Sequence, residues 1–198
     1  MAYDKFEILT STAVPLPIEN VDTDQIIPAR FLKATERKGF GDNLFRDWRY
    51  NNDNSPKTDF VLNDNTYSGK ILVGGRNFGS GSSREHAAWA VYDYGFRCVI
   101  SSFFADIFKG NCLNIGVLPV QVSADFSNKL FSEIEKDPKT AIEVNLQEQT
   151  VTLLATGEKE SFDINGYKKD NMLNGFDDID YLMNVKSDIV EFAKSTPL

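Results

Sequence analysis

Hydrophobic residues recur most regularly between residues 70 and 122, where they predict alternating strands and helices. Short apolar runs suited to buried strands alternate there with runs of helical spacing: strands at 70–75, 98–102 and 117–122, and helices at 82–95 and 104–116. Strand, helix, strand order at this spacing favours parallel pairing, because parallel neighbours need a long crossover connection. The sequence therefore predicts an α/β fold with a largely parallel sheet.

The flanking segments predict a second strand layer and covering helices. We expect extended chain at 5–17, an amphipathic helix at 124–138, antiparallel strands at 141–164, and a helical tail at 166–198 that breaks near Gly175. Residues 33–65 are mostly polar around one short amphipathic piece and predict a mobile loop over the surface. The expected architecture is one domain spanning residues 1–198, with a mixed sheet, a second strand layer and a helical C-terminal tail.

Composition and charge narrow the possible partners. The 198 residues are 41% hydrophobic and 25% charged, which suits one buried core, and the formal net charge is −8. An acidic surface repels phosphate backbones and anionic membranes, so we expect no nucleic-acid partner. The first residues hold no apolar run long enough for a signal peptide or a membrane span. We expect no membrane association and a cytoplasmic location.

Few residues in the chain could ligate a metal. Cys98, Cys112 and His86 are its only cysteines and histidine. An iron–sulfur cluster or a structural zinc site requires about four such ligands. We therefore expect that this chain alone binds no metal and that both cysteines are ordinary buried thiols. A disulfide is disfavoured in a cytosolic protein.

The segment GGRNFGSGSSREHAAWA, residues 74–90, places glycines and serines between a predicted strand and a predicted helix. The first N–H groups of a helix have no partner within it and can bind an anion. Arg84 is expected in the first turn, where a cation gains nothing from the helix dipole, so its position suggests an external carboxylate or phosphate. The alternative is that Ser82 or Ser83 only caps the helix, with Glu85 completing a capping box.

Three better-known glycine motifs are excluded by their spelling. A P-loop would need lysine after Gly79, which Ser80 follows instead. A dinucleotide fingerprint GxGxxG would need glycine where Arg84 stands. A serine-hydrolase elbow GxSxG would need serine where Gly81 stands. His86 lies close enough along a helix to serve Ser82 or Ser83 as a base, but a packed histidine is the favoured interpretation.

A second polar cluster, NVDTDQIIPARF at residues 20–31, contains Asp22, Asp24 and Arg30 around an apolar turn. By itself this cluster is typical of a solvated turn with a weak surface ion pair.

Four segments together resemble a known family. They are NVDTDQIIPARF, NFGSGSSREHAAWA, ISSFFADIFKGNCLNIGVLPV and NGFDDIDYL. Their order and sequence are similar to those of the small subunits of bacterial 3-isopropylmalate dehydratases, and the SSREHA core also resembles the swivelling domain of aconitase. The resemblance covers most of the chain and implies an aconitase-type swivelling β/β/α domain.

The resemblance also implies an activity. The family converts 2-isopropylmalate to 3-isopropylmalate through isopropylmaleate, in leucine biosynthesis. A four-iron four-sulfur cluster in a separate large subunit accepts the leaving hydroxyl. The chain is thus expected to bind no cofactor itself and to work as a hydro-lyase only in a heterodimer or larger assembly with that subunit.

Individual residues match the family's site. Ser82 matches the serine that, as an alkoxide, removes the proton next to a carboxylate of the dicarboxylate substrate. Ser83 and Arg84 match groups that bind this carboxylate. Arg30 corresponds to a second substrate-binding arginine, and Asp24 to an aspartate that orients polar groups.

Substrate choice is expected in the segment after Arg30. Phe31, Leu32, Lys33 and Ala34 resemble the loop that distinguishes isopropylmalate isomerases from homoaconitases, and Phe31 and Leu32 would suit an isopropyl group. Lys33 could point into solvent or reach a carboxylate. The alternatives are the small subunit of homoaconitase or of a related malate-type dehydratase, and a noncatalytic dicarboxylate-binding module.

Overall fold

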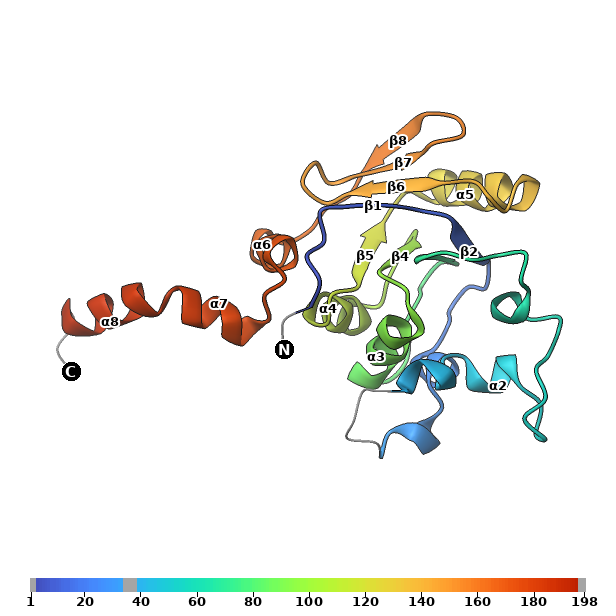
Figure 1. The fold of residues 1–198 in the computed structure, drawn as a ribbon, viewed down its shortest axis with the longest axis horizontal. Coiled ribbons are helices and arrows are strands. Elements are labelled where there is room, and N and C mark those ends of the chain that lie inside the picture. Colours follow the sequence, from blue (N-terminus) through green and yellow to red (C-terminus); the bar gives the residue numbers. More distant parts are fainter. Residues whose placement is uncertain (1–2, 34–38, 196–198) are drawn as a thin grey trace.

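The computed structural model describes residues 3–33 and 39–195 and divides the strands between two four-stranded sheets (Figure 1). One sheet is entirely parallel, in the order β2 (Ala13–Leu16), β3 (Ile71–Gly74), β4 (Cys98–Ser101) and β5 (Leu118–Gln121). The other is entirely antiparallel, in the order β1 (Ile8–Ser11), β6 (Ile142–Asn145), β7 (Thr150–Leu153) and β8 (Glu158–Ser161). The α/β class and the second strand layer are confirmed, but the main sheet is entirely parallel where a mixed sheet was expected.

Apolar residues fill both faces of the parallel sheet, as parallel strands require. On one face, Ile71, Val73 and Ile100 pack with side chains of the antiparallel sheet and of α5 (Ala124–Lys136). On the other face, Leu72 and Val99 pack with α3 (Glu85–Tyr94) and α4 (Asp106–Asn114). The glycine- and serine-rich segment follows the carboxyl end of β3 and leads into α3.

Residues 39–65 contribute to the core, although the sequence predicted a loop over the surface. They form the 3-10 helices η2 (Phe40–Asn43) and η3 (Val61–Asn63) and the helix α2 (Arg46–Arg49). Phe40, Leu44 and Phe45 are buried, and the Phe45 ring stacks on Trp48 at 5.5 Å between centroids. The burial of these apolar side chains outweighs the polar composition of the segment. The predicted mobility of residues 33–65 stays a prediction.

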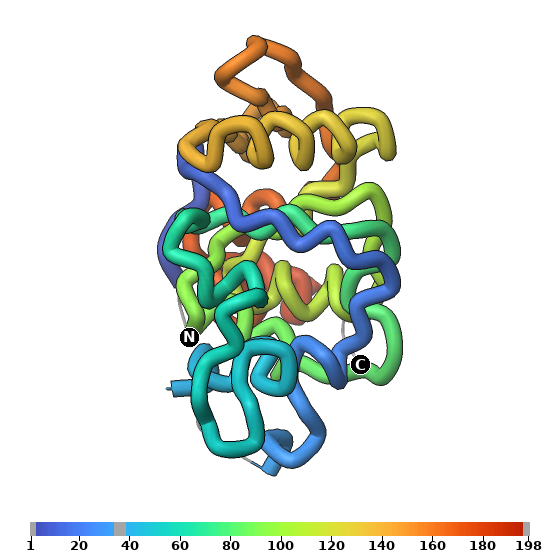
Figure 2. The backbone as a smooth tube through the Cα atoms, turned by 90° about the vertical axis from the view of Figure 1, so that its right-hand side faces the viewer, coloured from blue at the N-terminus to red at the C-terminus, as the bar shows by residue number. Residues whose placement is uncertain are grey.

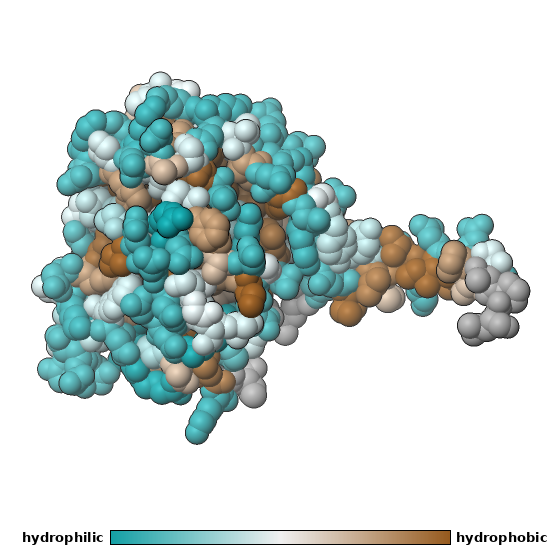
Figure 3. Space-filling view, turned by 180° about the vertical axis from the view of Figure 1, so that it is seen from behind, coloured by the Kyte–Doolittle hydropathy of each residue, from teal (hydrophilic) through white to brown (hydrophobic). Residues whose placement is uncertain are grey.

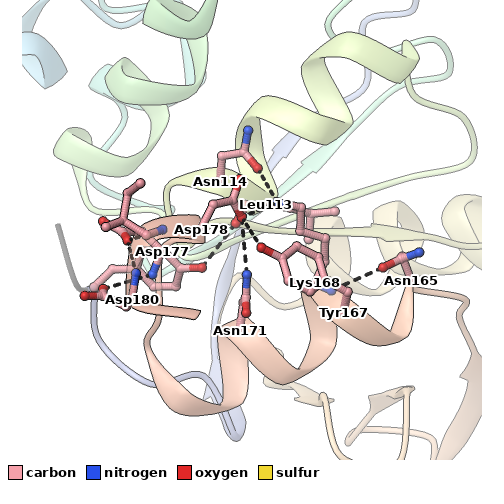
Figure 4. A network of polar contacts seen from close by, with 11 residues as sticks. Leu113, Asn114, Asn165, Tyr167, Lys168, Asn171, Asp177, Asp178 and Asp180 are labelled. Carbon is pink, nitrogen blue, oxygen red and sulfur yellow. Dashed lines mark hydrogen bonds and ion pairs between the residues drawn. The ribbon is translucent and has the colours of Figure 1, made fainter. Parts of the chain in front are cut away.

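The helical tail consists of α6 (Gly166–Asn174), α7 (Asp178–Asn184) and α8 (Lys186–Ser195). Gly175, at a φ of 71°, ends α6 where the sequence predicted a break. The Asp178 carboxylate accepts hydrogen bonds from Tyr167 Oη and Lys168 Nζ, both at 2.8 Å, and so ties α7 to α6 (Figure 4).

Beyond that junction, α7 and α8 project from the body of the molecule (Figure 1). In Figure 2, which is turned by 90°, they lie behind the body. Their apolar side chains are exposed on the projection (Figure 3), including Ile179, Leu182, Met183, Ile189 and Phe192. In the described residues, no helix combines the length and the apolar character needed to cross a membrane.

Candidate active site

The segment after β3 folds directly onto the second polar cluster. The N–H groups of Gly79 and Ser80 donate to the Val21 carbonyl oxygen, at 2.8 and 3.0 Å. In return, the Thr23 N–H donates to the Ser80 carbonyl oxygen at 2.8 Å. Thr23 Oγ1 donates to the carbonyl oxygen of Ser82 at 2.9 Å. Two segments about sixty residues apart, for which the sequence predicted no mutual contact, are therefore joined by hydrogen bonds.

Gly81 allows this close approach. Its φ is +89°, a left-handed conformation that side chains rarely adopt, and a Cβ atom there would overlap the Asp22 carboxylate. The same carboxylate caps α1 (Thr23–Ile26) in a capping box with Gln25, which fixes its position. The backbone before Ser82 is consequently held by a rigid neighbour.

Arg84 and Asp24 form an ion pair across the two segments. The Arg84 side chain is 15% exposed and that of Asp24 is 51% exposed, so the guanidinium is the enclosed partner. A cation at the start of α3 is unfavourable for the helix dipole, and Asp24 offsets that cost. The role of Asp24 in orienting polar groups of the site stays a prediction.

The start of α3 contradicts the capping alternative. The N-cap residue is Arg84, one position before the first turn in which the sequence placed it, and the helix has no side-chain cap. Ser82 and Ser83 are exposed, and neither hydroxyl hydrogen bonds to another residue within the described ranges. Glu85 does not complete a capping box, and its Oε1 instead accepts a hydrogen bond from Trp89 Nε1 at 3.0 Å.

His86 packs against aromatic rings, as the favoured interpretation of this residue held. Its ring centroid lies 4.5 Å from that of Trp89 and 5.6 Å from that of Phe40. The side chain is half-buried, and among the described residues no serine hydroxyl hydrogen bonds to it. The geometry therefore offers no serine–histidine dyad.

Arg30 pairs with a residue that the sequence did not single out. Its guanidinium donates through Nη1 and Nη2 to the two carboxylate oxygens of Asp47, the Nη1 bond measuring 3.0 Å. This hydrogen bond holds the pKa of Asp47 below its ordinary value and raises that of Arg30. Phe31 and Leu32 pack half-buried against the core. Lys33 is exposed, and Ala34 lies outside the described residues.

The residues present do not fit an iron–sulfur cluster. Within the described ranges, no group of three or more potential ligand side chains is arranged to hold a metal ion. Cys98 and Cys112 are fully buried free thiols, and burial raises the pKa of each well above its ordinary value. Cluster ligation requires thiolates, which this environment disfavours.

Comparison with known proteins decides the family. The family model of the aconitase C-terminal domain matches residues 3–125, and that of LeuD_N matches residues 128–166. The 3-isopropylmalate dehydratase small subunit of Cytophaga hutchinsonii is 58% identical, covering 98% of this chain and 96% of that protein. The chain belongs to the 3-isopropylmalate dehydratase small-subunit family. The same subunit of Christiangramia forsetii is 59% identical over 96% of this chain and 93% of its own length.

A solved structure agrees with the fold of this small subunit. A 3-isopropylmalate dehydratase from Methanocaldococcus jannaschii superposes with a TM-score of 0.68, covering 94% of this chain and 99% of that one. The two are 24% identical, so this likeness concerns the fold alone. The resemblance seen in the sequence is confirmed, and the family name implies a larger partner subunit.

Sequence reasoning missed two site residues of this small subunit. The sequence pattern places Thr23 in a polar turn and Asp47 in a predicted mobile loop. A signal for Thr23 was available in the spacing of Asp22 and Gln25, which is that of a capping box at the start of a helix. For Asp47 there was no local signal, because its partner lies seventeen residues away, in the 3-10 helix Ala29–Phe31.

Proposed function

We propose that this chain supplies the proton-transfer and carboxylate-binding half of the active site that isomerises 2-isopropylmalate to 3-isopropylmalate through isopropylmaleate. The observation that carries the proposal is the exposed Ser82 beside the uncapped start of α3 and the enclosed guanidinium of Arg84. The cluster is expected in the large subunit, since the described part of this chain offers no ligand set for it. We also expect a cytoplasmic location.

Ser82 is proposed as the base. Its hydroxyl first releases a proton to water in the open site, and the resulting alkoxide then takes the proton from the carbon next to a substrate carboxylate. The C–H electron pair forms the double bond of isopropylmaleate, while the hydroxyl on the neighbouring carbon departs with the C–O electrons towards the Lewis acid that the large subunit's cluster would supply. A free serine hydroxyl is a very weak acid, so the alkoxide needs positive potential close by. The dipole of α3 and the Arg84 guanidinium provide it, and a closed interface with the large subunit would strengthen both by excluding water.

Arg84 and Ser83 are proposed to bind the substrate carboxylate. Asp24 occupies part of the Arg84 guanidinium, which has five N–H donors, and leaves other donors for a ligand. A planar fork of donors matches the two oxygens of a carboxylate. Arg30 is proposed to hold a second carboxylate, with Phe31 and Leu32 forming the wall for the isopropyl group.

Reconstitution tests this function. The purified chain and its large subunit are mixed anaerobically, and hydration of isopropylmaleate is followed by the loss of its ultraviolet absorbance. We expect activity from the pair and none from either chain. An inactive pair whose large subunit holds an intact cluster would contradict the proposal, as would faster turnover of a homoaconitase substrate.

A noncatalytic binding module is tested separately by calorimetry. The chain alone is titrated with 2-isopropylmalate. Half a site should bind this dicarboxylate weakly, because the converging groups of the partner are missing. Tight binding by the isolated chain would favour the binding module.

A further inference from the structure

The ion pair between Arg30 and Asp47 occupies a residue that the proposed function needs for substrate. Both carboxylate oxygens of Asp47 accept from the two terminal nitrogens of Arg30. A substrate carboxylate would approach a guanidinium in the same two-pronged way. The Arg30 and Asp47 side chains are 54% and 59% exposed, and exposed ion pairs contribute little to stability. Exchange of one carboxylate for another therefore costs little.

The pair lies in a hollow of about 700 Å³ that is rich in cations. Among the described residues lining it, Asp47 is the one carboxylate, whereas Arg30, Arg46 and Lys57 carry positive charge. Lys57 Nζ donates to the Asp47 backbone oxygen at 2.9 Å, and the Arg46 guanidinium stacks over the Tyr50 ring at 3.9 Å. Within the described part of the chain, neither Arg46 nor Lys57 pairs with a carboxylate.

We propose that Asp47 is an internal competitor for the substrate: its carboxylate occupies Arg30 in the free subunit and gives way to a substrate carboxylate in the assembled enzyme. The released carboxylate remains beside Arg46 and Lys57, which compensate its charge. This inference rests on the proposed function of Arg30. It makes Asp47 a residue that sets the affinity and charge selectivity of the site, because only an anion can displace it.

The electrostatics of Asp47 are consistent with this exchange. The hydrogen bond from Arg30 is the largest cause of its lowered pKa, and the charges of Lys57 and Arg46 lower that pKa further. Asp47 therefore stays ionised after Arg30 turns to the substrate. An ionised competitor beside two cations can return to Arg30 when product leaves.

Asp47→Asn in the reconstituted enzyme is the first test. Asparagine keeps the size of the side chain but removes the competing charge, so KM should fall by about two- to fivefold, the range of an exposed ion pair. The value of kcat should change little. Glu158→Gln is the matched control. It breaks the exposed ion pair between Glu158 on β8 and Lys129 on α5, and it should leave KM unchanged. An unchanged or higher KM for Asp47→Asn would overturn the proposal.

Arg46→Gln and Lys57→Gln supply the second test. If these cations receive the displaced carboxylate, each change should raise KM in the wild-type background and have no effect when combined with Asp47→Asn. An equal increase in both backgrounds would mean direct contact with substrate and would overturn the receiving role. Thermal unfolding of each variant verifies that it is folded.

Failure of the proposed function would look different. It would show as an inactive wild-type pair, or as Arg30→Lys with an unaltered KM. The competitor alone fails when the wild-type enzyme is active, Arg30→Lys raises KM, and Asp47→Asn does not lower it.

Discussion

The Thr23 hydroxyl donates a hydrogen bond to the backbone carbonyl oxygen of Ser82, and so connects the start of α1 with the residue proposed as the base. Thr23 is 1% exposed whereas Ser82 is exposed, so the bond joins a buried side chain to a backbone group near the surface. The backbone of the serine segment is thereby fixed by a side chain outside it.

Thr23→Val should lower the free energy of unfolding of the subunit by about 1 kcal/mol. It should also lower the turnover of enzyme that remains folded. Valine keeps the shape but not the donor. Urea unfolding and dehydration rates are compared, and Thr23→Ser, which retains the hydroxyl, should restore most of the activity. Full activity of folded Thr23→Val would show that the bond does not position Ser82.

Ser82→Ala should abolish or severely reduce turnover while leaving subunit association and substrate affinity nearly unchanged. The side chain is exposed and is not a helix cap, so the change in stability should stay within about 0.5 kcal/mol. Single-turnover dehydration and thermal unfolding are measured side by side. A folded, fully active Ser82→Ala enzyme would eliminate the proposed base.

Arg84→Lys should weaken substrate binding as well as turnover. Lysine keeps the charge and can still pair with Asp24, but it loses the planar fork that binds a carboxylate at two points. The expected result is a higher KM and a lower kcat in the assembled enzyme. A change confined to kcat would assign Arg84 to transition-state stabilisation alone.

Gly81→Ala should destabilise the subunit by about 1–3 kcal/mol, because φ is +89° there and the new methyl group would meet the Asp22 carboxylate. Turnover should fall as the serine segment shifts. Gly110→Ala is the control, since it lies within α4 with open space around it. That substitution should stabilise the helix by about 0.5–1 kcal/mol. Equal effects of the two would refute the close approach at Gly81.

Tyr3 should make stability sensitive to alkaline pH. Burial, followed by the charge of Asp178, raises its pKa to about 12, so the folded state favours the neutral phenol. This contribution is complete below about pH 10, the ordinary value, and is lost as pH rises through the raised pKa. Urea midpoints from pH 9 to 12 should fall more steeply for the wild type than for Tyr3→Phe. Parallel curves would contradict the shifted pKa.

Local patterns in the sequence predicted those parts of the fold that local physics determines. Apolar runs identified β3, β4 and β5, and helical spacing identified α3, α4 and α5. The helix boundary at Arg84 was misplaced, because Ser82 is a good cap by composition while tertiary contacts draw its backbone towards Thr23. The core role of Phe40 and Phe45 was hidden by their polar neighbours.

The candidate site was predicted in composition but not in its internal contacts. Resemblance assigned candidate roles to Ser82, Arg84 and Arg30, and these roles stay predictions. It predicted neither the pairing of Arg84 with Asp24 nor that of Arg30 with Asp47. Each pair joins two separate helical segments or their ends. Such contacts follow from how the layers pack, which periodicity along one segment does not encode.

Because α3 begins at Arg84 without a side-chain cap, a bound carboxylate would complete this helix in the way that a capping residue completes others. Binding of the carboxylate and ordering of the first turn of α3 would then be thermodynamically coupled. By thermodynamic linkage, each tenfold rise in dicarboxylate concentration above its dissociation constant adds about 1.4 kcal/mol to the stability of the folded form. The substrate would thus act as a folding ligand for the subunit that binds it.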